Sequence, residues 1–528
     1  MSSSQFNAPL SRRKLLRYGA TGLAAISVGS TLAGCADSSA TSPATRDAAG
    51  KPQKGGTLHA GLTGGSPTDT LDAAQGINNT DFARIIALYD PLIVLDSNAQ
   101  QQNALAESVE PNATATVWTI RLKPGLTFHN GKPVTAEDVL YTLNRTVVNH
   151  YPAAADLTRI DLKSARILDS RTLELPCNSP FSILDQELAS NCYYLGIVPT
   201  NYDPKKPVGT GPFKYQSFTP GQQSIFTANK DYWDNGSGPY ADALVITDFT
   251  DETSQLNALQ SGQVDLVNQL SAVSIPTARS AGQVLIAQGG AMTPFVMRCD
   301  RPPFNDVRVR QAMRLVVDRP QMNNIVFGGH GTIGNDIFSP EDPDYDRSLP
   351  QRVQDIEQAK SLLASAGQSG LTVQLVVAPV SYGTVAAAQV FAQQAKKAGI
   401  TVNLSQITVT EMFGPNFLKW EFSMDTWYYE QYLPNVGNAT VPSAPYDETH
   451  FDDNAYNKLY AQALATVDAT KRSDIAHEMQ EIDYTTGGYI IPYFVASIDG
   501  YAKNVDGVVP AKTGVSFGNF NFKGMWLT

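Results

Sequence analysis

The chain has 528 residues, too many for one compact core, and this length predicts two or three domains. Its formal net charge of −11 argues against a nucleic-acid partner, because proteins that bind nucleic acids carry basic surfaces. None of the 4 cysteines belongs to a Cys-x-x-Cys pair and the 6 histidines are scattered singly, so we expect no metal site and no cofactor.

The N-terminus has the pattern of an export signal. Ser11–Leu16 contains Arg12 and Arg13, the pair that is typical of a twin-arginine signal, and a weakly apolar run follows over 18–33. That run is too rich in Gly, Ser and Thr to predict a membrane span. We therefore expect residues 1–34 to be a signal peptide for twin-arginine export.

Cys35 stands where a lipid can be attached. Leu32–Cys35 is similar to the lipobox of bacterial lipoproteins, whose cysteine is acylated and becomes the first residue. A buried core thiol is the alternative for a lone cysteine. The position at the end of a signal peptide favours lipidation, which would hold the protein at the outer face of the cytoplasmic membrane. Residues 35–54, rich in Ser, Ala, Thr and Pro, are predicted to be a flexible tether.

The folded part begins with short strands and helices in turn. Residues 55–62 are predicted to be a strand, and a helix is expected to end at Leu88. Apolar side chains alternate over 118–122, which again predicts a strand. Thr135–Asp138 then starts a helix with the pattern of a capping box.

Residues 207–234 have the clearest local pattern in the chain. Gly209–Pro212 supplies backbone freedom and then a fixed φ, a break that precedes a strand. Phe213–Phe218 and Ser224–Ala228 are predicted strands, joined by a turn at Pro220–Gly221. Taken alone, this pattern predicts a β-hairpin and nothing more.

Strands and helices alternate in the second half of the chain. Such alternation indicates α/β layers. The predicted helices cover 355–366, 384–398 and 411–419, the predicted strands cover 371–377, 400–407, 422–428 and 489–496, and a further amphipathic helix passes through Ile475, Met479 and Ile482.

A candidate ligand site lies near the end of the predicted strand 422–428. Ligands of α/β folds bind in loops beyond the strand ends, and a mixture of aromatic rings with a few polar groups suits a pocket. We therefore expect the ligand to contact Trp427, Tyr428, Tyr429, Glu430, Gln431 and Tyr432. Two alternatives stay open: Tyr428 or Tyr429 can be a core residue of the strand, and Glu430 can be an exposed loop acid.

Cys177 and Cys192 flank one short predicted helix. In an exported protein this arrangement permits a disulfide. The sequence does not give the separation of the two Cα atoms, so a disulfide and two free thiols are equally open.

Five segments, in chain order, resemble a known family. Gly209–Trp233, for example, begins with Gly-Thr-Gly-Pro and an aromatic residue, contains a Pro-Gly turn and ends with Asn-x-x-Tyr-Trp. This order resembles the signature of extracytoplasmic solute-binding proteins of family 5, which feed peptide and nickel ABC transporters. The other similar segments are Ala104–Gly131, Leu256–Leu266, Pro302–Val317 and Asp355–Gly367.

The resemblance implies an α/β fold of the periplasmic-binding-protein type II class. Two lobes would be joined by a two-stranded hinge, with an extra subdomain inserted in the first lobe. The expected division is lobe I at 55–96, 207–298 and 495–528, the inserted subdomain at 97–206, and lobe II at 299–494.

The resemblance also implies a function. We expect a monomeric, lipid-anchored, extracytoplasmic substrate-binding component of an ABC importer, which captures a small-molecule or peptide ligand between its lobes and delivers it to the transmembrane permease subunits. An oligopeptide or peptide-like amine is the expected ligand, although family members also take nickel complexes, sugars, haem and opine-like compounds. An extracytoplasmic hydrolase and a signalling receptor are the alternatives. The sequence has no His-Glu-x-x-His motif, and we expect a binding protein and not an enzyme.

The resemblance assigns roles to two residues. Peptide-binding members carry Gly-Trp-x-x-Asp-x-x-x-Pro, and its aspartate pairs with the α-ammonium of the peptide. Trp427 and Pro434 match this frame, so Glu430 falls on the aspartate position. Tyr382 falls where dipeptide binders have an arginine for the peptide carboxylate, and a phenol cannot form a bidentate ion pair. This combination implies an ammonium-bearing ligand other than a free dipeptide, because a longer peptide is held mainly by its backbone.

Overall fold

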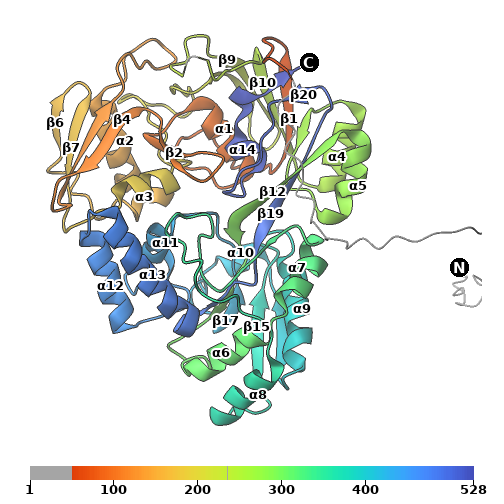
Figure 1. Ribbon diagram of the computed structural model, residues 1–528. Helices are drawn as coiled ribbons and strands as arrows, with labels where there is room; N and C mark the ends of the chain where they lie inside the picture. The colour runs from red at the N-terminus through yellow and green to blue at the C-terminus, as the bar shows by residue number, and fades with distance from the viewer. Residues whose placement is uncertain (1–49, 235) are drawn as a thin grey trace, which may run out of the picture. The chain divides into compact units, whose positions relative to one another are not determined.

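The computed structural model describes residues 50–234 and 236–528. Arg12, Arg13 and Cys35 lie outside these residues, so the predictions of twin-arginine export and lipidation stay predictions. Within the two described ranges, no helix combines the length and the apolar character needed to cross a bilayer. Two β-sheets, of eight and five strands, organise the described chain (Figure 1).

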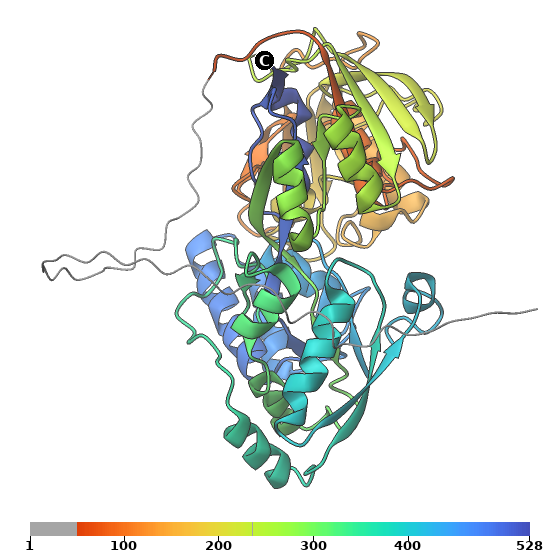
Figure 2. The same cartoon turned by 90° about the vertical axis from the view of Figure 1, so that its right-hand side faces the viewer.

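The larger sheet combines strands from the start, the middle and the end of the chain. Helices α4 (Glu252–Ser261) and α5 (Ile275–Ala281) pack against it (Figure 2), as does α1 (Asn79–Leu88). The order across the sheet is β12 (Gln283–Met292), β19 (Tyr493–Tyr501), β11 (Leu266–Val267), β1 (Thr57–Thr63), β10 (Ala243–Phe249), β9 (Gln223–Ala228) and β8 (Phe213–Thr219), with β14 (Thr332–Ile333) paired to β19.

The predicted hairpin is confirmed as β8 and β9. The two strands pair antiparallel from Phe213–Ala228 to Thr219–Gln223. Gly221 lies in the turn with φ +70°, a conformation that glycine adopts without strain. Phe213 and Phe226 are fully buried, so the alternation of apolar residues directs one face of the hairpin into the core.

The smaller sheet has the α/β layering that the alternation predicts. β15 (Thr372–Val377) is parallel to both β16 (Thr401–Gln406) and β17 (Phe422–Met424). The remaining strands are β13 (Phe295–Met297) and β18 (Tyr489–Ile490), and the associated helices are α6 (Val307–Leu315), α7 (Arg319–Phe327), α8 (Ile356–Ser365) and α9 (Thr384–Lys396).

Three predicted elements are wrong in their extent. The strand expected over 489–496 is divided into β18 of the smaller sheet and β19 of the larger one, with Pro492 between them. The strand expected over 422–428 ends at Met424, because the chain then turns to bond Asp425 N to Pro294 O and to pair Trp427 with Met292. The helix expected over 411–419 is only α10 (Val409–Met412). Pro415 lacks the N–H that a continuing helix needs.

Apart from the short strand β14, which pairs with β19, the chain crosses between the two sheets twice. It leaves the larger sheet after β12 and enters the smaller one at β13, and it returns between β18 and β19. The two crossing segments are neighbours, since β12 pairs with β19 along its length and Met292 lies opposite Phe494 (Figure 1). The sheet changes at 293–294 and 491–492, close to the lobe boundaries expected after 298 and 494. The division into lobes itself stays a prediction.

A separate four-stranded antiparallel sheet lies in the region expected to be the inserted subdomain. Its order is β4 (Ala106–Pro111), β5 (Val117–Leu122), β7 (Thr172–Pro176) and β6 (Arg166–Asp169), with α2 (Ala136–Val148) packed on it. The predicted capping box is confirmed: Thr135 N donates to Asp138 Oδ2 over 2.9 Å at the start of α2. Trp118 is 1% exposed and donates from Nε1 to Phe181 O.

The helices after β17 contact this four-stranded region. Ser182 donates from its hydroxyl to Ala463 O over 2.9 Å and from its backbone to Leu464 O over 2.8 Å.

The remaining helices are α3 (Leu184–Ser190), α11 (Tyr432–Ala439), α12 (Asn454–Ala465), α13 (Ala469–Thr486) and α14 (Ser516–Phe520). The short elements are β2 (Ile93–Leu95), β3 (Gln101–Asn103), β20 (Val505–Asp506), β21 (Trp526–Leu527) and the 3₁₀ turns Pro152–Ala154, Ala272–Ser274 and Phe522–Gly524.

The suggested disulfide does not form. Cys177 and Cys192 are free thiols in the structure. Cys177 follows β7 and donates its backbone N–H to Thr116 O, whereas Cys192 follows α3, where burial raises the pKa of its thiol to about 12. The two cysteines therefore belong to different parts of the four-stranded region.

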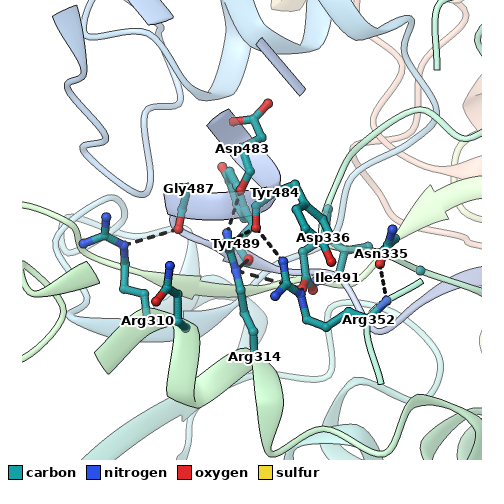
Figure 3. A network of polar contacts seen from close by, with 12 residues as sticks. Arg310, Arg314, Asn335, Asp336, Arg352, Asp483, Tyr484, Gly487, Tyr489 and Ile491 are labelled. Atoms are coloured by element: carbon teal, nitrogen blue, oxygen red, sulfur yellow. Dashed lines mark hydrogen bonds and ion pairs between the residues drawn. The ribbon is translucent and has the colours of Figure 1, made fainter. Parts of the chain in front are cut away.

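A buried network of arginines holds the return crossing (Figure 3). Asp336 accepts a hydrogen bond from Arg319 over 2.7 Å, is ion-paired with Arg352 at 2.8 Å and accepts from Ile491 N over 2.8 Å. Burial favours the neutral acid, but Arg319, Arg352 and Arg314 together hold the pKa of Asp336 below its ordinary value. The carboxylate thus anchors the segment that leads into β19.

Arg314 fixes the preceding stretch of chain. Its guanidinium donates to Tyr489 O over 2.9 Å, to Tyr484 O over 3.0 Å and to Asp483 O over 3.1 Å (Figure 3). Two of these carbonyls lie in the last turn of α13, and the third belongs to the first residue of β18. One guanidinium therefore satisfies three buried acceptors.

Candidate functional site

The candidate site is a cavity of about 190 Å³ that residues from distant parts of the chain enclose. It lies beside the crossing between the two sheets, because Trp427 and Met292 exchange backbone hydrogen bonds there. The lining residues are Asn79, Phe82, Pro152, Asp156, Ser190, Asn191, Tyr193, Tyr194, Thr426, Trp427, Tyr428, Tyr429, Glu430, Asn438, Tyr446 and Val515.

Aromatic rings form much of the wall. Phe82 of α1 makes edge contacts with Tyr194 at 5.5 Å and with Tyr428 at 5.8 Å between ring centroids. Trp427 makes a similar contact with Tyr446 at 6.1 Å. Such rings present apolar faces that also attract cations.

Glu430 carries the carboxylate of the wall. Asn438 of α11 donates from Nδ2 to Glu430 Oε2 over 3.2 Å, and Ser339 donates its hydroxyl to Glu430 O over 2.7 Å. Burial and, to a smaller extent, the charge of Asp156 raise the pKa of Glu430 to about 8, against the hydrogen bond from Asn438. A cation placed beside Glu430 would favour its ionised form.

A second carboxyl group lines the same cavity. Asp156 follows the 3₁₀ turn Pro152–Ala154 and hydrogen-bonds the side chains of Asn438 and Asn191. Burial raises the pKa of Asp156 to about 6. Among the described residues, no lysine, arginine or histidine lines this cavity. The wall therefore favours a ligand with positive charge and disfavours a ligand with an unpaired carboxylate.

Four of the seven predicted ligand residues line the cavity: Trp427, Tyr428, Tyr429 and Glu430. Tyr428 is 49% exposed and Tyr429 is 5% exposed, so Tyr429 provides mainly a buried edge of the wall and Tyr428 an accessible ring. Glu430 is neither a strand core residue nor a fully exposed loop acid.

The other three predicted residues lie elsewhere. Gln431 accepts a hydrogen bond from Gln101 over 2.8 Å, and Tyr432 is buried and donates from its hydroxyl to Asp483 over 2.7 Å, so both support the structure behind the cavity. Tyr382 is not brought to Glu430. The loop after β15 faces α7, and Tyr382 lines a separate shallow pocket there, with its ring 5.8 Å from Phe327.

Several lining residues carried no predictive signal. Asp156, Asn191 and Asn438 are isolated polar residues in segments without a motif. Tyr193 and Tyr194 are adjacent aromatic residues, a weak sign of a pocket that resembles the one at Trp427–Tyr429. The cavity is assembled from segments that only the fold brings together.

A Gly-x-Ser-x-Gly spacing does occur, at Gly514–Gly518. Ser516 is only 3% exposed and donates its hydroxyl to Asp499 Oδ1 over 2.9 Å. A nucleophile elbow instead presents an exposed serine hydroxyl hydrogen-bonded to a histidine. The spacing therefore gives no support to a hydrolase.

Comparison with known proteins identifies the family. Residues 100–457 match the family model of bacterial extracellular solute-binding proteins, family 5. A curated relative, the oligopeptide-binding protein AppA of Bacillus subtilis, is 28% identical over 358 residues, which cover 64% of this chain and 64% of the relative. The chain thus aligns with less than two thirds of that relative's length.

Solved structures share the fold. The ABC transporter substrate-binding protein CtaP from Listeria monocytogenes superposes with a TM-score of 0.78 at 18% identity, over 90% of this chain and 100% of that one. AppA from Bacillus subtilis, in complex with a nonapeptide, gives a TM-score of 0.72 at 21% identity, over 90% and 100%. The expected mixed α/β fold of type II periplasmic binding proteins is therefore confirmed. The family is one of solute-binding proteins and not of enzymes, and the chain belongs to it, as a bacterial extracellular solute-binding protein of family 5.

Proposed function

We propose that this protein is the substrate-binding component of an ABC importer and that it captures an oligopeptide or peptide-like amine through a positively charged group. The family and the relative named for oligopeptide binding support the importer role. The ligand class rests on the chemistry of the cavity. Ligand would enter between the two sheets and be delivered to the transmembrane permease subunits.

Glu430 is the observation that carries the proposal. It lines an aromatic cavity in which, within the described part of the chain, no basic side chain neutralises it. Burying a carboxylate without a counter-charge costs several kcal/mol, and a ligand that supplies the charge would offset this cost. An ammonium group in contact with Glu430 would form a charge-assisted hydrogen bond worth about 1.5–3 kcal/mol.

The cavity also bears on the form of the ligand. Tyr382, expected to meet the ligand carboxylate, lies in another pocket, so the argument from this residue against a free dipeptide no longer applies. The argument now rests on the cavity wall, which carries carboxylates and no basic side chain among the residues described. A ligand whose own carboxylate lies far from its ammonium, such as a longer peptide, or an amine without a carboxylate, fits this wall best.

The cellular setting is part of the proposal. Export by the twin-arginine route and acylation of Cys35 would place a monomeric protein at the outer face of the cytoplasmic membrane. Residues 35–54 would leave the folded part free to reach the permease.

Mass spectrometry of native protein purified from its own cells tests the proposed function. We expect a co-purifying peptide or amine, and addition of that compound at a hundredfold excess over its Kd should stabilise the protein by about 2.7 kcal/mol. A co-purifying anion or sugar, with no stabilisation by a panel of peptides and amines, would contradict the proposal.

A further inference from the structure

The cavity offers two carboxyl groups to a cationic ligand. Glu430 and Asp156 both line it, and Glu187 of α3 is close enough for their charges to act on it. Glu187 is 5% exposed and its Oε2 has no hydrogen-bond partner within the described chain. Burial, together with the charges of Asp156 and Glu430, raises the pKa of Glu187 well above its ordinary value.

Within the described residues, a positive charge acts on Glu187 but on neither acid of the wall. Arg159 is the positive charge that acts on Glu187, and its guanidinium also lies 5.8 Å from the ring centroids of Phe181 and Tyr460. Asp185, the fourth acid nearby, has Arg472 as its own counter-charge. Burial favours the neutral form of Glu187, so Glu430 and Asp156 are the two carboxyl groups of the wall that lack a counter-charge among the described residues.

We propose that the ligand presents two positive charges to this cavity, one to Glu430 and one to Asp156, and that Asp156 selects for the second charge. This inference rests on the proposed function, because it concerns the same cavity. The chemical class is a compound with two amino or guanidino groups a few carbon atoms apart. A peptide with a basic N-terminal residue and a free diamine both have this chemistry.

The spacing of the two carboxylates supports two charges on one small ligand. Asn438 donates to Glu430 over 3.2 Å, and Asp156 is close enough for its charge to raise the pKa of Glu430. The two acids therefore share one cavity of about 190 Å³. The α- and ε-ammonium groups of an N-terminal lysine can reach both.

The rest of the wall suits the carbon chain between the charges. Phe82, Tyr194 and Tyr428 pack edge to face and present ring surfaces to the cavity. Rings beside carboxylates are the surroundings in which ammonium groups bind tightly in proteins. The uncharged amides of Asn191 and Asn438 hold Asp156 in place without neutralising it.

Titration calorimetry with matched probes tests the inference. Lysyl-alanyl-alanine is compared with norleucyl-alanyl-alanine, and 1,4-diaminobutane with 1-aminobutane, since the members of each pair differ by one positive charge. We expect the dication of at least one pair to bind wild-type protein at least tenfold more tightly. The peptide pair and the diamine pair separate the two sources of this chemistry.

Variants then assign the preference to Asp156. Asp156→Asn should reduce the preference for the dication to less than threefold. Glu430→Gln should weaken every probe. Asp231→Asn, an acid whose side chain is 85% exposed, should change none of these affinities.

The outcomes distinguish this inference from the proposed function. If the monocation and the dication bind wild-type protein equally, the inference that the ligand presents a second positive charge to Asp156 is contradicted. The proposal that Glu430 binds an amine is then unaffected. If none of the four probes binds, both claims are contradicted. The wild-type comparison needs no variant, so it decides the matter even if Asp156→Asn fails to fold.

Discussion

Asn438 donates a hydrogen bond of 3.2 Å to Glu430, eight residues before it on the chain, and so fixes the carboxylate in the wall of the cavity. Glu430 ends the aromatic segment, and Asn438 lies near the end of α11. The carboxylate is thus positioned by a neutral donor that leaves its charge uncompensated. This relationship makes Glu430 available to a cationic ligand.

The ligand-free protein should be more stable without this carboxylate. The pKa of Glu430 is about 8 in the folded protein against 4.5 when unfolded. A raised pKa favours folding fully below pH 4.5, and this stabilisation is lost as the pH rises towards 8. Glu430→Gln removes the titration, so its melting temperature should exceed that of wild type by an amount that grows from pH 5 to pH 8 and then levels.

Thermal unfolding at pH 5, 6.5, 8 and 9 measures this difference. Glu110→Gln, which changes an exposed acid on β4, is the matched control and should follow wild type at every pH. A constant offset between Glu430→Gln and wild type across the series would contradict the raised pKa.

Amine binding should release protons at neutral pH. Because Glu430 is largely protonated there in the free protein, a bound cation must displace its proton. Affinity for 1,4-diaminobutane, whose amino groups resemble lysine with a pKa of about 10.4, should rise from pH 6 to pH 8 and then level. Calorimetry in buffers of different ionisation enthalpy counts the protons released, and a count of zero at pH 7 would be inconsistent with this mechanism.

Asp336 should be essential for stability. Asp336→Asn leaves Arg319 and Arg352 buried without their counter-charge, and removal of one partner of a buried pair costs about 3–5 kcal/mol. Glu357→Gln, which removes an exposed partner of Lys360, should cost less than about 1 kcal/mol. Urea unfolding compares the two variants. A loss below 1 kcal/mol for Asp336→Asn would show that the network in Figure 3 does not hold the return crossing.

Cys35 should determine attachment to the membrane. We expect Cys35→Ser to leave the protein folded but in the soluble fraction, because the acylated residue is lost. Immunoblots of membrane and soluble fractions measure this. Cys299→Ser, which changes a thiol of the folded part, is the control and should stay with the membrane. Recovery of Cys35→Ser in the membrane pellet would contradict the prediction that a lipid on Cys35 anchors the protein.

Local sequence patterns predicted the helices and strands well where turn residues, capping residues and alternating apolar residues mark their ends. The hairpin of β8 and β9 follows from a Pro-Gly turn and alternating apolar residues, and α2 begins at its capping box. β17 ends early because tertiary hydrogen bonds draw Asp425 and Trp427 towards the 292–294 segment, and no local pattern encodes that contact.

The candidate site was only half predictable. A carboxylate among aromatic residues indicated Glu430 and its neighbours on one continuous segment. Asp156 and Tyr194 come from segments far away in the sequence, so only the folded chain shows that they share the cavity. Tyr382 lies in a loop that faces α7, and no local pattern in the sequence shows that this loop is away from the cavity.

The central claim is that Glu430 binds the positive charge of the ligand. Titration calorimetry of wild type and Glu430→Gln with norleucyl-alanyl-alanine, which offers one ammonium group, tests it most directly at pH 8. We predict that the variant binds at least tenfold more weakly, equivalent to about 1.4 kcal/mol, while Glu110→Gln binds like wild type. Equal affinities for wild type and Glu430→Gln would mean that the carboxylate does not contact the ligand cation.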